Sequence, residues 1–190
     1  MSSWNYNLFF RVNQLIGKHK LFDRLMTFCA HDLIYLLFFF TFLWAATALF
    51  QKSPDEFDEY VKLLLTAGLF GFITSWAIGI VHPHVRPIRE FPYVKQLLKP
   101  FGSWKSFPSD HTIASFTLAL ITLFVGAPLW FALALVGAAF FISIARVYAG
   151  AHYPIDVVGG ILISLFFSAT SFWLLENVTQ PMYDVFQSLF

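Results

Sequence analysis

The longest stretch of the chain without a charged residue runs from residue 112 to residue 145 and contains 34 residues. A single helix of this length would be about 51 Å long at a rise of about 1.5 Å per residue, whereas the hydrocarbon core of a bilayer is only about 30 Å thick. Gly126-Ala127-Pro128 lies near the middle of the stretch, and glycine and proline both break helices. The stretch therefore predicts two membrane-spanning helices joined by a tight hairpin.

Three further apolar segments are long enough to span a membrane, which takes about 20 residues. They cover residues 33–50, 63–81 and 157–175, and the acidic residues 55–59 are expected to form a loop between the first two. Hydrophobic residues make up 58% of the chain and charged residues only 12%, about half of the usual quarter. The sequence thus predicts an all-α, multi-pass protein of a cell membrane with about five transmembrane helices.

We expect one domain over residues 1–190, with a transmembrane core at residues 31–176. In residues 1–30, apolar side chains recur at helical spacing while basic residues occupy other faces. This pattern predicts helices that lie along the membrane surface, and a short sixth span is the alternative. The tail, residues 177–190, is expected to form a similar interfacial helix. The apolar positions that define the first of these helices are Trp4, Leu8, Val12 and Leu15.

Composition also excludes several classes of partner. The net charge is +1 and no basic stretch resembles a nucleic-acid-binding arm, so no nucleic-acid partner is expected. The single cysteine, Cys29, rules out an intramolecular disulfide and a cysteine-based metal site. No cluster of acidic residues suggests a catalytic metal, so we expect no cofactor. No signal peptide is expected either, because charged residues interrupt the first thirty positions; the sequence predicts no oligomeric state.

Three polar clusters interrupt the apolar segments. They are Arg86-Pro87, then Pro108-Ser109-Asp110-His111, and then a run that contains Arg146, His152 and Asp156. If five helices alternate in direction, the end of the second, the start of the third, the end of the fourth and the start of the fifth share one membrane face. Ionisable groups buried among membrane spans are costly and therefore usually functional. The clusters predict one active site at that face; the structural alternative is a polar network that fixes helix packing.

Arginine and a helix N-terminus are suited to binding phosphate. Arg86 and Arg146 each offer a planar guanidinium that binds phosphate through two hydrogen bonds. Ser109 would add a hydroxyl at the start of a helix, where free N–H groups and the helix dipole favour an anion. These residues predict a site for a phosphate group.

Two histidines supply the remaining chemistry of phosphoryl transfer. His152 and Asp156 are four residues apart, so their side chains would meet on a helix. The carboxylate would set the tautomer of His152 and stabilise charge as the imidazole attacks phosphorus. His111 is then free to act as the general acid for the leaving group. We therefore expect a nucleophile, its orienting carboxylate and an acid in one site, with metal-independent turnover.

The third cluster resembles a motif of the type 2 phosphatidic acid phosphatase superfamily, whose helical core is shared with vanadium haloperoxidases. The family motif is serine-arginine-x5-histidine-x3-aspartate. Arg146, His152 and Asp156 match it with the spacing intact, and Ala145 replaces the serine. The resemblance implies that His152 forms a phosphohistidine and that Asp156 supports it.

The second cluster resembles the family motif proline-serine-glycine-histidine. Pro108, Ser109 and His111 match, while Asp110 stands where glycine is usual. By this resemblance His111 protonates the leaving group and Ser109 holds the phosphate. Asp110 is still expected to bind the substrate, because it keeps its backbone N–H, but its carboxylate adds a negative charge that disfavours an anion unless it points away or is paired.

The first family motif, lysine-x6-arginine-proline, is matched only in part. Arg86-Pro87 fits, and the resemblance implies that Arg86 and Arg146 hold the phosphate. Gly79 occupies the position of the lysine, so one cationic donor is missing. Four residues are candidates to replace it: Arg89, His82, His84 and Lys105.

The sequence in and around the second and third motifs most closely resembles one branch of the superfamily. This branch is the bacterial undecaprenyl pyrophosphate phosphatases of the bacitracin-resistance type. This resemblance implies hydrolysis of undecaprenyl diphosphate to undecaprenyl phosphate, which recycles the cell-wall carrier lipid. A phosphatase for phosphatidic acid, phosphatidylglycerophosphate or lipid A is the alternative within the enzyme class. A transporter of anionic lipid is the alternative outside it, although transport requires no nucleophile.

The distribution of basic residues and the family resemblance predict opposite orientations of the active face. Without the two arginines of the site, eight basic residues fall on the face of the polar clusters and two on the other, which predicts a cytoplasmic active face. The resemblance implies an outward-facing site. We adopt the outward orientation, because a face that handles phosphate is basic for its own reasons. The eight are Arg11, Lys18, Lys20, Arg24, Arg89, Lys95, Lys99 and Lys105, and the two are Lys52 and Lys62.

Overall fold

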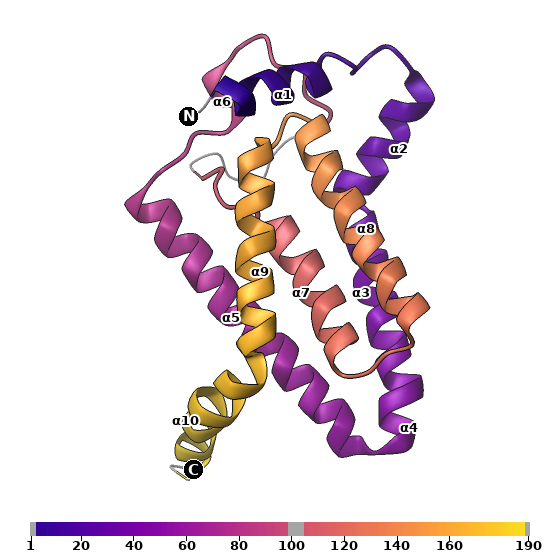
Figure 1. Cartoon of the computed structure of the whole chain (residues 1–190), viewed down its shortest axis with the longest axis vertical. Helices are drawn as coiled ribbons and strands as arrows, with labels where there is room; N and C mark the ends of the chain where they lie inside the picture. Colours follow the sequence, from indigo (N-terminus) through magenta and orange to yellow (C-terminus); the bar gives the residue numbers. More distant parts are fainter. Residues whose placement is uncertain (1–2, 99–104, 189–190) are drawn as a thin grey trace.

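The computed structural model describes residues 3–98 and 105–188, and all regular structure in these residues is helical. Lys99 therefore lies outside the described residues. Long helices run side by side and short helices cap the two ends of the bundle (Figure 1). The long helices are α3 (Leu33–Trp44), which continues through a π-helical turn (Ala45–Leu49) into α4 (Phe50–Lys52), α5 (Pro54–Val81), α7 (Asp110–Phe124), α8 (Leu129–Tyr148) and α9 (Pro154–Leu174). The short helices are α1 (Ser3–Asn13), α2 (Lys20–His31), α6 (Pro87–Glu90) and, after a second π-helical turn (Leu175–Thr179), α10 (Gln180–Gln187).

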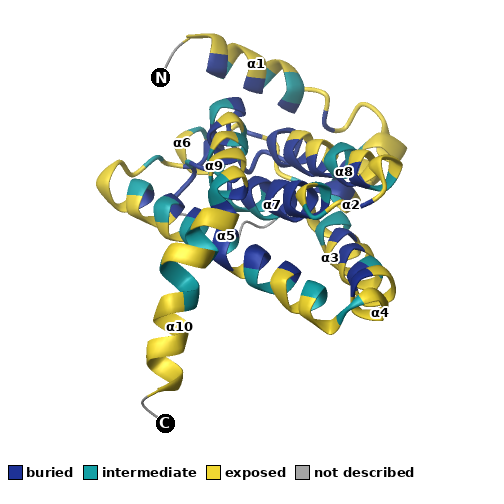
Figure 2. Ribbon diagram, turned by 60° about the horizontal axis from the view of Figure 1, so that its bottom comes forward, coloured by how far each residue is buried: buried dark blue, intermediate teal, exposed yellow. Residues whose placement is uncertain are grey.

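Helix α7 forms the centre of the bundle. It packs against α5, α8 and α9, and most of its residues are buried (Figure 2). It has 15 residues, about 22 Å at about 1.5 Å per residue. Four helical segments among the described residues are long and apolar enough to cross a membrane, and α7 is a shorter fifth. The prediction of an all-α membrane protein is confirmed, and because neighbouring helices surround α7, its length need not match the bilayer.

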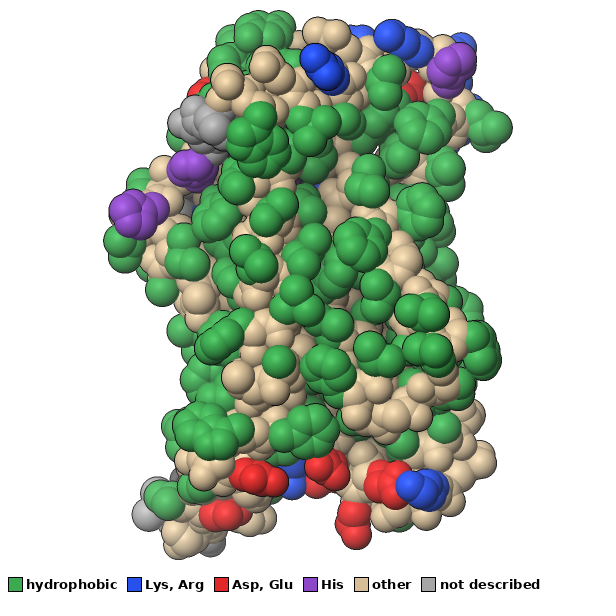
Figure 3. Space-filling view, in the orientation of Figure 1, with side chains coloured by type: hydrophobic (Ala, Val, Ile, Leu, Met, Phe, Trp, Pro, Cys, Tyr) green, Lys and Arg blue, Asp and Glu red, His purple; other side chains and the backbone are tan. Residues whose placement is uncertain are grey.

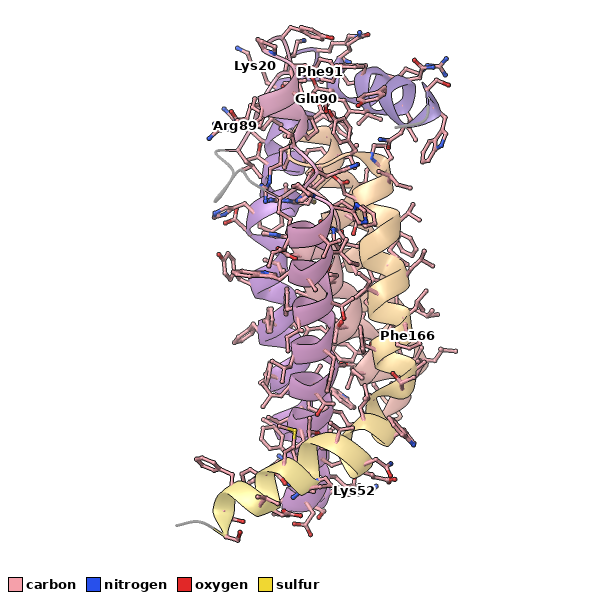
Figure 4. All side chains as sticks on the ribbon, turned by 90° about the vertical axis from the view of Figure 1, so that its left-hand side faces the viewer. Lys20, Lys52, Arg89, Glu90, Phe91 and Phe166 are labelled. Carbon is pink, nitrogen blue, oxygen red and sulfur yellow. The ribbon has the colours of Figure 1, made fainter. Side chains whose placement is uncertain are left out.

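The surface of the bundle agrees with a membrane setting. Hydrophobic side chains cover its middle in a broad band, and charged side chains gather at the two ends (Figure 3). Lys20, Arg89 and Glu90 lie at one end, Lys52 lies at the other, and Phe166 points outward from the middle of α9 (Figure 4). The interfacial placement of α1, α2 and α10 stays a prediction.

The predicted hairpin between residues 112 and 145 is confirmed. Helix α7 ends at Phe124 and α8 begins at Leu129. Gly126 has a φ of 85°, the left-handed conformation that glycine adopts after a helix C-terminus. Its N–H donates to the carbonyl of Leu123 at 3.1 Å, so the last turn of α7 is closed before the chain reverses.

The expected loop at residues 55–59 is wrong. Helix α5 begins at Pro54 and includes the whole acidic segment. Ser53 caps it by accepting the N–H of Asp55 at 3.2 Å, and proline and acidic residues are favoured in a first turn. Two ion pairs one turn apart stabilise this end, Lys52–Glu56 at 2.7 Å and Lys62–Asp58 at 2.7 Å.

Helices α7 and α9 approach closely at Gly160. A β-carbon added there would lie 2.9 Å from the carbonyl oxygen of Ser109 and 2.9 Å from the β-carbon of Thr112. Both atoms belong to the first turn of α7 or its cap, so neither can yield without moving the helix. Gly160 therefore fixes the distance between the starts of the two helices.

Gly160→Ala is expected to lower the thermal unfolding midpoint in detergent, because the added methyl group overpacks a rigid contact at a cost of about 1–3 kcal/mol. Gly137→Ala is the matched control on α8, since its added β-carbon would meet nothing within 4 Å. Alanine favours a helix over glycine by about 1 kcal/mol, so the control should unfold at the same or a higher temperature. Equal midpoints for the two variants would contradict this account.

Candidate active site

The structure brings together the four helix ends that carry the polar clusters. Arg86 follows α5, Ser109 precedes α7, Arg146 lies in the last turn of α8, and Asp156 lies in the first turn of α9. All four side chains are buried. The site therefore forms at the end of the bundle that α1 and α6 cover (Figure 1).

His152 is buried in the turn between α8 and α9, and its Nδ1 atom faces two oxygen atoms. The carbonyl oxygen of Ser106 lies at 2.9 Å and Oδ2 of Asp156 at 3.4 Å. Since both neighbours only accept hydrogen bonds, Nδ1 carries the proton in the neutral ring. Nε2 then keeps its lone pair, which is the arrangement that a nucleophilic histidine requires.

Asp156 connects this turn to the segment before α7. Its Oδ2 atom accepts the hydroxyl of Ser106 at 2.5 Å and the N–H of Tyr153 at 2.7 Å. Its carbonyl oxygen accepts the N–H of Ser109 at 3.0 Å. The expected contact with His152 is present, but it crosses the start of α9 and does not lie along a helix face. Asp156 thus positions the loop as well as the imidazole.

The two arginines are held through only part of their hydrogen-bonding capacity. Arg86 donates from Nε to the carbonyl of Lys105 at 3.0 Å, and Arg146 donates from Nη1 to the carbonyl of Ala30 at 3.1 Å. Nη1 of Arg86 and Nε of Arg146 are buried and have no hydrogen-bond partner among the described residues. A buried donor without a partner is costly, so these atoms are prepared to bind an anion.

Ser109 and His111 lie at the start of α7. Ser109 occupies the N-cap position, but its hydroxyl makes no capping bond; it accepts the hydroxyl of Thr112 at 3.1 Å, which leaves its own proton available to a ligand. His111 is half-buried, and the charged groups that act on it are Arg86, Arg146 and Asp110. A phosphate bound among these groups would favour a protonated His111.

The carboxylate of Asp110 is paired with a cation, so its negative charge does not stand unopposed beside the phosphate site. Its Oδ1 atom accepts from Nζ of Lys105 at 2.5 Å and from the hydroxyl of Ser75 at 2.7 Å. Sequence reasoning missed Ser75, a small residue inside an apolar helix with no motif around it. Lys105 was one of four candidates that spacing could not separate.

Helix α1 is bound to the catalytic turn. Glu90 accepts the hydroxyls of Tyr6 at 2.8 Å and Tyr153 at 2.6 Å. Asn5 accepts the N–H of Ile155 at 3.0 Å. Burial and the Glu90 carboxylate raise the pKa of Tyr153, so it remains a donor. Periodicity along α1 predicted a helix, but nothing in its residues indicated these partners.

A cavity of about 540 Å³ opens beside the site, between the end of α5 and the start of α9. Its walls include the apolar side chains of Ile78, Val81, Phe107 and Ile155. Phe107 and Ile155 are direct neighbours in sequence of Ser106 and Asp156. The cavity therefore lies against the loop before α7 and the first turn of α9, next to the segments that carry the site.

Residues 59–180 match the family model described as the PAP2 superfamily. The chain belongs to this superfamily. The fold agrees, because the crystal structure of Aquifex aeolicus LpxE superposes with a TM-score of 0.73 at 28% identity, over 90% of this chain and 96% of that one. The resemblance that the three motifs indicated is confirmed.

Curated relatives carry more than one substrate in their names. YbjG of Escherichia coli K12, provisionally named an undecaprenyl-diphosphatase, is 31% identical over 99% of this chain and 91% of the relative. Undecaprenyl-diphosphatase BcrC of Bacillus subtilis strain 168 is 23% identical over 95% of this chain and 89% of the relative. A lipid A 1-phosphatase of Rhizobium johnstonii is 32% identical over 54% of this chain and 41% of the relative.

The pH dependence of turnover should reflect the environment of His152. Burial lowers the pKa of His152, and the Asp156 carboxylate opposes this shift. The pKa of His152 thus lies below the ordinary value of about 6.5. The ring therefore remains neutral when the pH falls from neutrality to somewhat below about 6.5. The acid limb of kcat/KM for phosphate release, which reports the free protein, is therefore expected below about pH 6.5.

Asp156→Asn removes the group that raises the pKa of His152, so its acid limb should move to still lower pH while the maximal rate falls. The measurement is phosphate release across a pH series for both proteins. A shift toward higher pH in the variant would contradict the proposed electrostatic role of Asp156.

Proposed function

We propose that this protein hydrolyses undecaprenyl diphosphate to undecaprenyl phosphate and inorganic phosphate. The observation that carries the proposal is the position of His152. Its Nε2 atom is left free by the contacts of Nδ1 with Ser106 and Asp156, and Arg86 and Arg146 hold unpaired donors in the same buried site. A nucleophile beside donors for phosphate oxygens is what phosphoryl transfer requires.

In the proposed mechanism, Nε2 of His152 attacks the terminal phosphorus and a nitrogen–phosphorus bond forms. The bond from phosphorus to the bridging oxygen breaks, its electron pair passes to that oxygen, and His111 supplies the proton. His111 then accepts a proton from water, which attacks the phosphohistidine and releases phosphate. Arg86, Arg146 and Ser109 stabilise the charge on the transferred phosphoryl group.

The relatives and the cavity support a long apolar lipid diphosphate. Two relatives that match almost the whole chain bear undecaprenyl-diphosphatase names. The cavity beside Phe107, whose wall is apolar at Ile78, Val81 and Ile155, would take the first isoprene units while the diphosphate meets the arginines. Phosphatidic acid, phosphatidylglycerophosphate and lipid A remain the comparison substrates, since a lipid A phosphatase also matches part of the chain.

Purified protein in detergent with a metal chelator should release phosphate from undecaprenyl diphosphate faster than from the three comparison lipids. His152→Ala should lower this release at least about ten-thousandfold, because removing a nucleophile abolishes the shared chemistry of the site. Phosphate release and retained lipid binding are measured for both proteins.

Faster release from a glycerophospholipid or lipid A would overturn the substrate and keep the histidine mechanism. Release that the chelator abolishes would overturn metal independence. Translocation of lipid without any phosphate release, in the wild-type protein, would favour the anionic-lipid transporter.

We also propose that the active end of the bundle faces outward in a multi-pass plasma or inner membrane. Lys20 and Lys52 are exposed at opposite ends (Figure 4), so each can carry a reporter cysteine in a Cys29→Ala background. A membrane-impermeant maleimide applied to intact cells (with the outer membrane permeabilised, where there is one) should label Lys20→Cys and spare Lys52→Cys. The reverse pattern would place the site in the cytoplasm, as the distribution of basic residues predicts.

A further inference from the structure

Lys105, Ser75 and Asp110 form a closed triangle of polar groups beside the site. Nζ of Lys105 lies 2.6 Å from the hydroxyl oxygen of Ser75 and 2.5 Å from Oδ1 of Asp110. The Ser75 hydroxyl and Oδ1 of Asp110 are 2.7 Å apart. The Lys105 side chain is only 5% exposed, whereas that of Asp110 is 37% exposed.

The triangle lies beside two of the three departures from the family motifs. Gly79 stands where the first motif has lysine, and Asp110 stands where the second has glycine. Ser75 precedes Gly79 by four residues on α5, so the two share one face of the helix. Side chains on a helix lean toward its N-terminus, and a lysine at position 79 would therefore reach back over the turn that carries Ser75. The ammonium group of Lys105 lies against that same turn.

Lys105 is also part of the segment that builds the site. Its carbonyl oxygen accepts Nε of Arg86, and the carbonyl of the next residue, Ser106, contacts Nδ1 of His152. The charge of Asp110 acts on both Arg86 and Arg146. The ammonium group therefore belongs to the same electrostatic environment as the two arginines.

We propose that Lys105 is a substrate-binding residue that replaces the missing lysine of the first motif, delivering its ammonium group to the substrate phosphates from the loop before α7. Asp110 and Ser75 hold the ammonium group in position beside the phosphate site. The pair adds no net charge, so Asp110 offsets the cation while the site is empty. This inference rests on the proposed phosphatase function and adds a third cationic donor to it.

Removing Lys105 alone would leave the half-buried carboxylate of Asp110 without its cation, which destabilises a fold whatever the function. The test therefore replaces both charges, in Lys105→Met/Asp110→Asn. Lys62→Met/Asp58→Asn is the matched control, since that pair lies at the opposite end of the bundle. The relocated variant Gly79→Lys/Lys105→Met/Asp110→Gly restores the family pattern.

The double variant at the site should raise the inhibition constant of orthovanadate at least about tenfold, as loss of one charged hydrogen bond predicts, and lower kcat/KM about 100-fold. Its unfolding midpoint should stay close to that of the control. The relocated variant should recover at least about tenfold of the lost kcat/KM. Wild-type inhibition and turnover in the double variant, or no recovery in the relocated variant, would overturn the proposal.

Orthovanadate binding read from tryptophan fluorescence separates this inference from the proposed function. If the wild-type protein hydrolyses no lipid, the proposed function fails, and weaker vanadate binding by the double variant would still support Lys105. Equal binding by both proteins would overturn the role of Lys105 alone. A wild-type protein that binds no vanadate would overturn both.

Discussion

The carboxylate of Asp156, buried in the first turn of α9, accepts hydrogen bonds from Ser106 and from the N–H of Tyr153. Its backbone carbonyl accepts the N–H of Ser109 at the start of α7. One residue thus ties together the loop before α7, the turn after α8 and α9 itself. Burying a carboxylate is costly unless it is hydrogen-bonded, and Oδ2 of Asp156 is paired in this way, whereas Oδ1 is buried without a partner among the described residues. The segments that bind Oδ2 are also the segments that place His152, so the geometry of the site depends on these contacts.

The cationic groups of the site differ in how far they are paired. The positive charges of Arg86 and Arg146 are buried with part of their donors unpaired, whereas Lys105 is neutralised by Asp110. The site therefore keeps the guanidinium groups of Arg86 and Arg146 available and restrains the flexible ammonium group of Lys105. A phosphate ligand would complete the hydrogen bonding of the arginines without forcing a large rearrangement, because backbone carbonyls already fix one end of each guanidinium.

The sequence predicted the helices and the meeting of their ends better than it predicted the contacts between them. Long apolar runs and the Gly126-Pro128 turn are local signals, and alternation of direction alone brought Arg86, Ser109, Arg146 and Asp156 to one face. The run of acidic residues predicted a solvated loop before α5, but this prediction is wrong. Ser53 caps the helix and Pro54 begins it, so the acidic residues lie within α5. Ser75 and the partners of α1 could not be predicted, since each depends on segments far apart in sequence that carry no motif.

The attachment of α1 has a consequence for how the protein is made. Asn5 binds the backbone of Ile155, which is 150 residues later in the chain, and Tyr6 binds Glu90, 84 residues later. During synthesis α1 is made before both partners, so its contacts with Glu90 and Ile155 form only after the helices between them have been made. The catalytic turn is completed only when α9 has entered the bundle. A nascent chain that lacks α9 therefore cannot assemble the His152 site, because Asp156 belongs to that helix.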